Sequence, residues 1–183
     1  MAINLSKGQR ATVAATKFTI GLGWDENNTD TGVEFDLDAS IFICNDNHKL
    51  ISESHFIFYN NLSDPEKAVN HSGDNRTGSG EGDDESIAID LTKINPNATE
   101  LNIVVTIHDA IARHQNFGQV RNAYIRIIDE NNNELMKYEL DEDFSIETAI
   151  EFGRIYKRNN EWKFEAVGTG MKGGLESFVQ RYQ

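Results

Sequence analysis

VEFDLDASIFIC, residues 33–44, changes its pattern half-way along. The first half alternates apolar and acidic residues, which is the period of a strand with one polar face. The second half is apolar on both faces, which is typical of a strand buried in the middle of a fold. We therefore predict a central strand that is polar at one end, where Asp36 and Asp38 project from the same face.

The rest of the chain also favours strands. Further apolar or alternating runs occur at residues 18–24, 50–59, 86–91, 101–107, 120–128, 134–140, 149–158 and 161–167. Helical signals are confined to a short helix expected to begin at Ser63-Asp64-Pro65 and a terminal helix over residues 175–183. About nine strands with little helix predict a mainly β fold. We expect a β-sandwich of two sheets with a few short helices, in a single domain over residues 1–183.

The charge, the apolar runs and the cysteine content of the chain exclude some classes of function. The 183 residues include 30 Asp and Glu against 17 Lys and Arg. Such an acidic surface repels nucleic acid, so we expect no nucleic-acid partner. No apolar run has the length of a transmembrane segment, and residues 1–7 lack the pattern of a signal peptide. The single cysteine, Cys44, fits a reducing compartment. We expect a cytoplasmic protein, and peripheral association with the inner membrane stays open.

HSGDNRTGSGEGDDE, residues 71–85, places five carboxylates among four glycines. Glycines let a backbone turn so that carbonyls and side chains point inward. Calcium takes roughly six to eight oxygen ligands, mostly carboxylates, carbonyls and water. Asp36 and Asp38 would add carboxylates from a strand end, as would Asp25 after the strand that ends at Trp24. The residues alone leave two interpretations open, a solvated acidic loop or one wall of a calcium site.

Other motifs are rejected. Residues 74–85 begin with Asp and end with Glu, but Arg76, Gly78 and Ser79 stand where an EF-hand loop needs ligands and a turn glycine. Magnesium is less suited than calcium because it keeps waters and rarely uses an all-protein cage. The histidines show no zinc spacing, and GTGMKG at 168–173 lacks the βαβ context of a dinucleotide site. No catalytic residue is assigned.

A set of short motifs follows one order along nearly the whole chain. These are Lys7-Gly8-Gln9, GLGWD at 21–25, FDLDAS at 35–40, GDNRTG at 73–78, GDDE at 82–85, Phe117-Gly118, Trp162-Lys163-Phe164 and Gly173-Gly174-Leu175. This order resembles the TerD family of bacterial tellurite-resistance and general stress proteins. GDNRTG followed by GDDE is the specific part of the resemblance, and the other motifs support it.

The resemblance implies a cytoplasmic β-sandwich that binds calcium, as two ions, through the acidic loop and neighbouring strand-end acids. By matching motif position, the candidate ligands are Asp25, Asp36, Asp38, Asp74, Asn75, Glu81, Asp83, Asp84 and Glu85. It also implies other stress or tellurite-resistance proteins as partners and no established catalytic step. We expect a stress-response module in which calcium orders the binding of a partner or ligand. The alternative is a calcium-dependent enzyme, or a binder of a small anionic or nucleotide-like metabolite.

Overall fold

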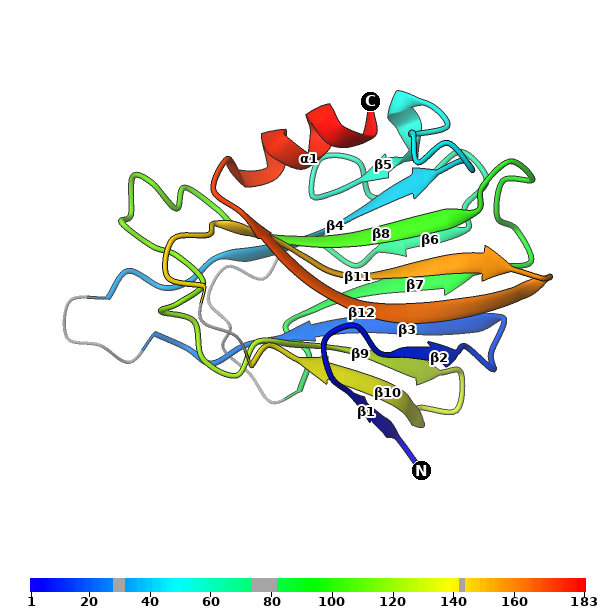
Figure 1. The fold of residues 1–183 in the computed structure, drawn as a ribbon, viewed down its shortest axis with the longest axis horizontal. Helices are drawn as coiled ribbons and strands as arrows, with labels where there is room; N and C mark the ends of the chain where they lie inside the picture. Colours follow the sequence, from blue (N-terminus) through cyan, green and yellow to red (C-terminus); the bar gives the residue numbers. More distant parts are fainter. Residues whose placement is uncertain (28–31, 74–81, 142–143) are drawn as a thin grey trace.

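Two six-stranded sheets pack face to face in the computed structural model, which describes residues 1–27, 32–73, 82–141 and 144–183 (Figure 1). Sheet A runs β1 (Ile3–Leu5), β10 (Glu134–Glu139), β9 (Tyr124–Asp129), β3 (Lys17–Gly23), β7 (Glu85–Asp90) and β6 (Val69–His71). Sheet B runs β2 (Arg10–Thr12), β12 (Glu161–Met171), β11 (Ala149–Arg158), β8 (Glu100–Ile107), β4 (Leu37–Cys44) and β5 (Phe56–Ile57). The predicted β-sandwich is confirmed.

The main core lies between the inner faces of the sheets. Leu22 of β3 and Ile87 of β7 pack there with Ile41 of β4 and Ile103 of β8. Each strand contributes alternate residues to this core, because successive side chains of a strand point to opposite faces.

The helix α1 (Gly174–Tyr182), predicted at the end of the chain, covers the outer face of sheet B (Figure 1). Its Phe178 and Tyr182 form a second apolar cluster with Phe42, Val104 and other residues of the sheet. β4 is therefore buried on both faces, which explains its apolar run. Cys44 is fully buried, and burial raises the pKa of its thiol to about 12, as suits a packing residue.

The expected helix at Ser63-Asp64-Pro65 is wrong. The Asp64 carboxylate accepts the backbone N–H of Val69 at 2.8 Å, and Lys67 has a φ of 60°. A residue with positive φ cannot continue a right-handed helix, so the segment folds as a turn. Asp64 caps this turn instead of a helix.

Several strand boundaries also differ from the prediction. The run at 50–59 supplies only the 3₁₀ helix η1 (Glu53–His55) and the short strand β5. β4 begins at Leu37, so Asp36 lies directly before the strand. Across the described ranges, neither α1 nor η1 is long and apolar enough to cross a membrane.

Candidate functional site

Three strand ends that carry candidate ligands lie at one end of the sandwich (Figure 1). β3 ends there, and β4 and β7 begin there. The antiparallel pairing of β3 with β7 places Leu22 opposite Glu85. Asp25 follows β3, Asp36 precedes β4 and Asp84 precedes β7. The fold therefore brings residues from distant parts of the sequence to the same end of the molecule.

Asp36 and Asp38 line one cavity of about 370 Å³ at this end. Their exposed fractions are only 5% and 6%. Arg113 Nη1 lies 3.9 Å from Asp36 Oδ2, and His108 Nδ1 lies 3.8 Å from Asp38 Oδ2. Both distances exceed that of a direct hydrogen bond. The prediction that these two aspartates share one face is thus matched by a shared cavity.

A backbone hydrogen bond and a ring contact lie at the rim of the cavity. The His108 N–H donates to the Asp36 carbonyl oxygen at 2.8 Å, which ties the end of β8 to the start of β4. Tyr59 completes the wall and packs edge-on against His108, with ring centroids 6.2 Å apart. Sequence reasoning gave no signal for Tyr59 or Arg113, which stand outside any acidic or glycine-rich pattern.

Asp84 is fixed against the end of β3. Its Oδ2 accepts the Trp24 N–H at 3.0 Å, and its own N–H donates to the Leu22 carbonyl at 2.7 Å. Burial raises the pKa of Asp84 and the Trp24 hydrogen bond opposes this, while the charges of Asp83 and Glu26 raise it further. Negative charge at this position is therefore costly without a nearby cation.

Glu85 joins the two sheets. Its Oε2 accepts the backbone N–H of Ala39 in β4 at 2.8 Å, and the side chain is 2% exposed. His71 Nε2 lies 3.6 Å from the same oxygen and 3.1 Å from the Ala39 carbonyl oxygen. Because the Gly73 N–H donates to His71 Nδ1 at 3.0 Å, the neutral ring carries its proton on Nε2. Glu85 thus braces the start of β4 from the opposite sheet.

Asp83 lies on the outer face of sheet A. Its Oδ1 accepts hydrogen bonds from Arg126 Nε at 2.8 Å and from the Tyr124 hydroxyl at 3.0 Å. A Cβ at Gly21 would overlap the Asp83 carboxylate, so glycine is needed for this close approach. Burial and the Asp83 charge together raise the pKa of Tyr124 to about 12.

Asp25 is exposed beside these residues. Its Oδ2 accepts a hydrogen bond from Asn122 Nδ2 at 2.7 Å, and its backbone N–H donates to the Arg121 carbonyl at 3.0 Å. These contacts hold the carboxylate near the loop before β9.

The TerD domain family matches residues 1–182 of the chain. The chain belongs to the TerD family. Tellurium resistance protein TerD of Serratia marcescens is 49% identical over 188 residues, covering 100% of this chain and 97% of that protein. General stress protein 16U of Bacillus subtilis (strain 168) is 50% identical, with the same coverage. A solved homologue of telluride resistance protein (TerD) from Streptomyces coelicolor A3(2) has a TM-score of 0.71 at 20% identity, covering 90% of this chain and 95% of that one, which supports the fold.

In this TerD protein the candidate ligands occupy separate positions around one end. Asp36 and Asp38 share a cavity, Asp84 and Glu85 brace strand ends, and Asp83 is paired on the outer face. Asp74, Asn75 and Glu81 lie outside the described residues. Among the residues that are described, no group of three or more His, Cys, Asp or Glu side chains is placed to hold a metal ion.

Proposed function

We propose that this TerD protein is a calcium-binding stress-response module, in which calcium orders a surface for a partner or a ligand. The observation that carries the proposal is the cavity shared by Asp36 and Asp38, since both carboxylates are nearly excluded from water. Buried carboxylates are stabilised by a nearby cation. Names among the TerD relatives, which refer to tellurium resistance and general stress, supply the biological context.

The donor chemistry of the cavity suits calcium. Carboxylate oxygens are the ligands that this hard cation prefers, and Asp36 and Asp38 would supply two of them. Asp84 lies at the same end, and its raised pKa favours a cation nearby. Further oxygens would have to come from water and from Asp74, Asn75 and Glu81. We expect two ions, on the TerD resemblance. Asp25, Asp83 and Glu85 each use one carboxylate oxygen in the hydrogen bonds described above, and each has a second oxygen that would serve as a ligand.

Bound calcium would be the largest local charge at this end of the protein. It would offset repulsion among the carboxylates and present a positive centre beside an otherwise acidic surface. A partner protein with exposed carboxylates or phosphates would recognise that centre. We propose other stress or tellurite-resistance proteins as the partners.

A second function is favoured by the cations of the same cavity. Arg113 and His108 stand beside the two aspartates, and an anionic group could bridge Arg113 and a calcium ion. The protein would then bind a small anionic or nucleotide-like metabolite, or act on it as a calcium-dependent enzyme. Retention of a metabolite by the purified calcium-loaded protein, and its loss on adding chelator, would favour this function over partner recruitment.

Thermal melting with chelator, calcium or magnesium tests the calcium site. A ligand present at a hundred times its dissociation constant stabilises the folded state by about 2.7 kcal/mol. We expect calcium to raise the melting temperature and magnesium to raise it less. An unchanged melting temperature across a calcium titration would reject the proposal.

The double variant Asp36→Asn/Asp38→Asn identifies the ligands. We expect it to fold and to lose most of the calcium-induced shift, because two charged oxygens are replaced in the cavity. The control Asp46→Asn/Glu161→Gln removes the same charge from two exposed positions, in the turn after β4 and at the start of β12, and should keep the full shift. If both doubles respond like the native protein, calcium binds elsewhere.

A further inference from the structure

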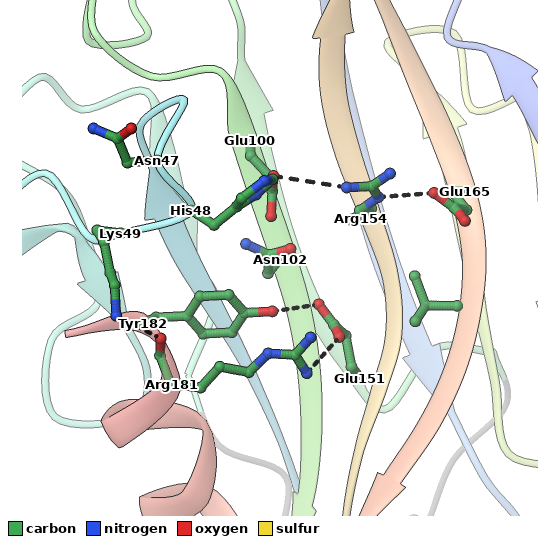
Figure 2. A pocket seen from close by; sticks show the side chains of 11 residues that line it. Asn47, His48, Lys49, Glu100, Asn102, Glu151, Arg154, Glu165, Arg181 and Tyr182 are labelled. Carbon is green, nitrogen blue, oxygen red and sulfur yellow. Dashed lines mark hydrogen bonds and ion pairs between the residues drawn. The ribbon is translucent and has the colours of Figure 1, made fainter.

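A second cavity, of about 470 Å³, lies on the outer face of sheet B beside the C-terminal end of α1 (Figure 2). Its walls come from β8, β11 and β12, from the turn after β4 and from the last residues of the helix. That turn follows the C-terminal end of β4, whereas Asp36 and Asp38 lie at its N-terminal end. This cavity is therefore separate from the proposed calcium site.

The floor of the cavity is acidic. Glu100 and Glu151 line it with exposed fractions of only 6% and 4%, on the neighbouring strands β8 and β11. Tyr182 donates its hydroxyl proton to Glu151 Oε1 at 2.6 Å, and His48 Nδ1 lies 2.7 Å from Glu100 Oε2. Burial raises the pKa of Glu151, so its negative charge is costly there.

Asn102 stands between these two carboxylates on the cavity floor (Figure 2). The residue is fully buried, and its Nδ2 donates to Cys44 Sγ at 3.5 Å. Its Oδ1 accepts no hydrogen bond from the described residues. A buried amide oxygen without a hydrogen bond destabilises the folded state. A ligand that donates an N–H to this oxygen would remove that cost.

The rim of the cavity is basic. The side chains of Arg154, Arg181 and His48 are 28%, 49% and 65% exposed, so they surround the floor from the solvent side. Arg154 Nη1 lies 3.7 Å from Glu100 Oε2, and Arg181 Nη1 lies 3.6 Å from Glu151 Oε2. Both separations exceed that of a direct hydrogen bond. Arg154 Nε also donates to Glu165 Oε2 at 2.8 Å. Because a guanidinium group carries five N–H donors, Arg154 and Arg181 can each bind a ligand beside these acids.

A β-bulge creates this arrangement. The register of β11 shifts between Glu151 and Gly153 against both neighbouring strands. Without the shift, Glu151 and Arg154 would face opposite sides of the sheet, because they are three residues apart. Bulges re-aim side chains and are common beside binding sites. Here the bulge turns a buried acid and a basic rim residue into the same cavity.

We propose that this cavity binds a small zwitterion that carries a primary ammonium group and a carboxylate, as a free amino acid does. The ammonium group would point to the floor, where Glu100, Glu151 and Asn102 Oδ1 accept its hydrogen bonds. The carboxylate would point outward to Arg154 and Arg181, since guanidinium groups bind carboxylates in a planar fork. A cavity of this volume is within the usual range for small-molecule sites.

The acidic floor and the basic rim together require a ligand with both an ammonium group and a carboxylate. A simple anion would bring its charge towards two buried carboxylates, which is unfavourable. A simple cation would bind the acidic floor but would make no favourable contact with the guanidinium groups of the rim. The zwitterion alone matches the inward acidic floor and the outward basic rim.

Calorimetric titrations in the presence of chelator test the proposal. The probes are L-norvaline and 5-aminopentanoate as zwitterions, with pentylamine and pentanoate as compounds that each lack one charged end. We expect saturable binding of at least one zwitterion, about tenfold tighter than either single-ended compound, which equals about 1.4 kcal/mol. Absence of saturable binding by both zwitterions, or equal binding of pentylamine, would overturn the proposal.

A matched pair of arginine variants locates the binding. Arg181→Gln should weaken binding of the zwitterion about tenfold relative to that of pentylamine, because only the zwitterion loses a partner for its carboxylate. Loss of the charge 3.6 Å from Glu151 acts on the ammonium group of both compounds alike. Arg158→Gln removes an exposed arginine at the β11–β12 turn and should change neither affinity. A ratio of zwitterion to pentylamine affinity that is the same in Arg181→Gln as in the native protein would place the zwitterion outside this cavity. Arg181 is exposed, so the variant should fold as the native protein does. Arg154→Lys replaces the other planar guanidinium group and should likewise lower the preference for the zwitterion over pentylamine.

Discussion

The two cavities at opposite ends of β4 follow different structural rules. At one end, Asp36 and Asp38 are two residues apart, and ordinary strand alternation is enough to bring them together. At the other end, Glu151 and Arg154 are three residues apart and meet only because of a bulge. The comparison teaches that regular alternation is visible in a sequence, whereas a site built on a register shift is hidden from it.

The charges of the two cavities differ as well. In the first, the two buried acids have Arg113 at 3.9 Å and His108 at 3.8 Å, both beyond a direct hydrogen bond, so an added cation would offset their charge. In the second, Glu100 faces His48 and Arg154, and Glu151 faces Arg181 and accepts a hydrogen bond from the neutral Tyr182 hydroxyl. A ligand for the second cavity therefore has to carry both signs of charge.

Gly153→Ala should break the second cavity and give the largest effect. A Cβ at this position would lie 2.5 Å from the Phe164 ring and 2.9 Å from the Glu165 carbonyl oxygen. We expect a loss of about 2–3 kcal/mol in the free energy of unfolding, as for other overpacked sites. Denaturant unfolding measures this loss.

The double variant Gly153→Ala/Phe164→Leu serves as its control. Removing part of the ring should recover some of the lost stability, although the contact with the backbone remains. The calcium-induced shift of the folded variant should persist, because the first cavity does not depend on the bulge. Loss of the calcium response without loss of stability would show that the two ends are coupled.

Glu151→Gln should have an intermediate effect that depends on pH. Burial, the largest cause, and the charge of Glu100 raise the pKa of Glu151, whereas the Tyr182 hydroxyl, Arg181 and Arg154 oppose them. The folded-state pKa therefore lies above the ordinary value of 4.5. Between these two values the folded state binds more protons than the unfolded state, so stability falls as pH rises. Glutamine keeps an acceptor for Tyr182 and removes this dependence.

Melting curves recorded from acid to neutral pH check this prediction. We expect the variant to gain about 1 kcal/mol over the native protein at neutral pH, a usual size for one substitution. The two melting temperatures should converge as pH falls towards 4.5. A gain that is constant with pH would mean that the Glu151 charge is not its source.

Arg113→Gln should give the smallest effect, at the first cavity. Removing a positive charge 3.9 Å from Asp36 lowers the competition with a bound cation. In a water-like dielectric such a change is worth about 0.5–1 kcal/mol, so calcium should bind a few-fold more tightly. Titrations at low and high salt measure this, and the difference should shrink as salt screens the charges. An unchanged calcium affinity at low salt would mean that Arg113 lies too far from the ion to matter.

Much of the fold was predictable because its signals are local. The hairpin of β11 and β12 was expected from alternation on both sides of Asn159-Asn160, and those asparagines indeed take φ values of 52° and 61°. The terminal helix was also predicted from its own residues, at 175–183, and α1 lies at Gly174–Tyr182. The predicted helix at Ser63 failed because its start signal, Asp64, serves equally well in a turn, where Val69 supplies the N–H.

The candidate site was predictable only in part. Asp36 and Asp38 share a cavity as their spacing indicated. The hydrogen bonds of Asp83 with Arg126 and Tyr124 could not be predicted from the sequence, because these partners stand about forty residues further along the chain. The sequence shows which residues carry charge, but pairing between distant strands decides which charges are already matched. The calcium assignment remains a prediction for the titrations above.

The places of β1 and β2 have a consequence for the order of folding. β1 forms one edge of sheet A by pairing with β10, and β2 forms one edge of sheet B by pairing with β12. Ile3 thus pairs with Met136, and Thr12 with Lys163. Closing such long loops is entropically costly and slow. During synthesis, these first strands must wait for most of the chain to leave the ribosome, and until they dock, the edges of β10 and β12 stay open to other chains.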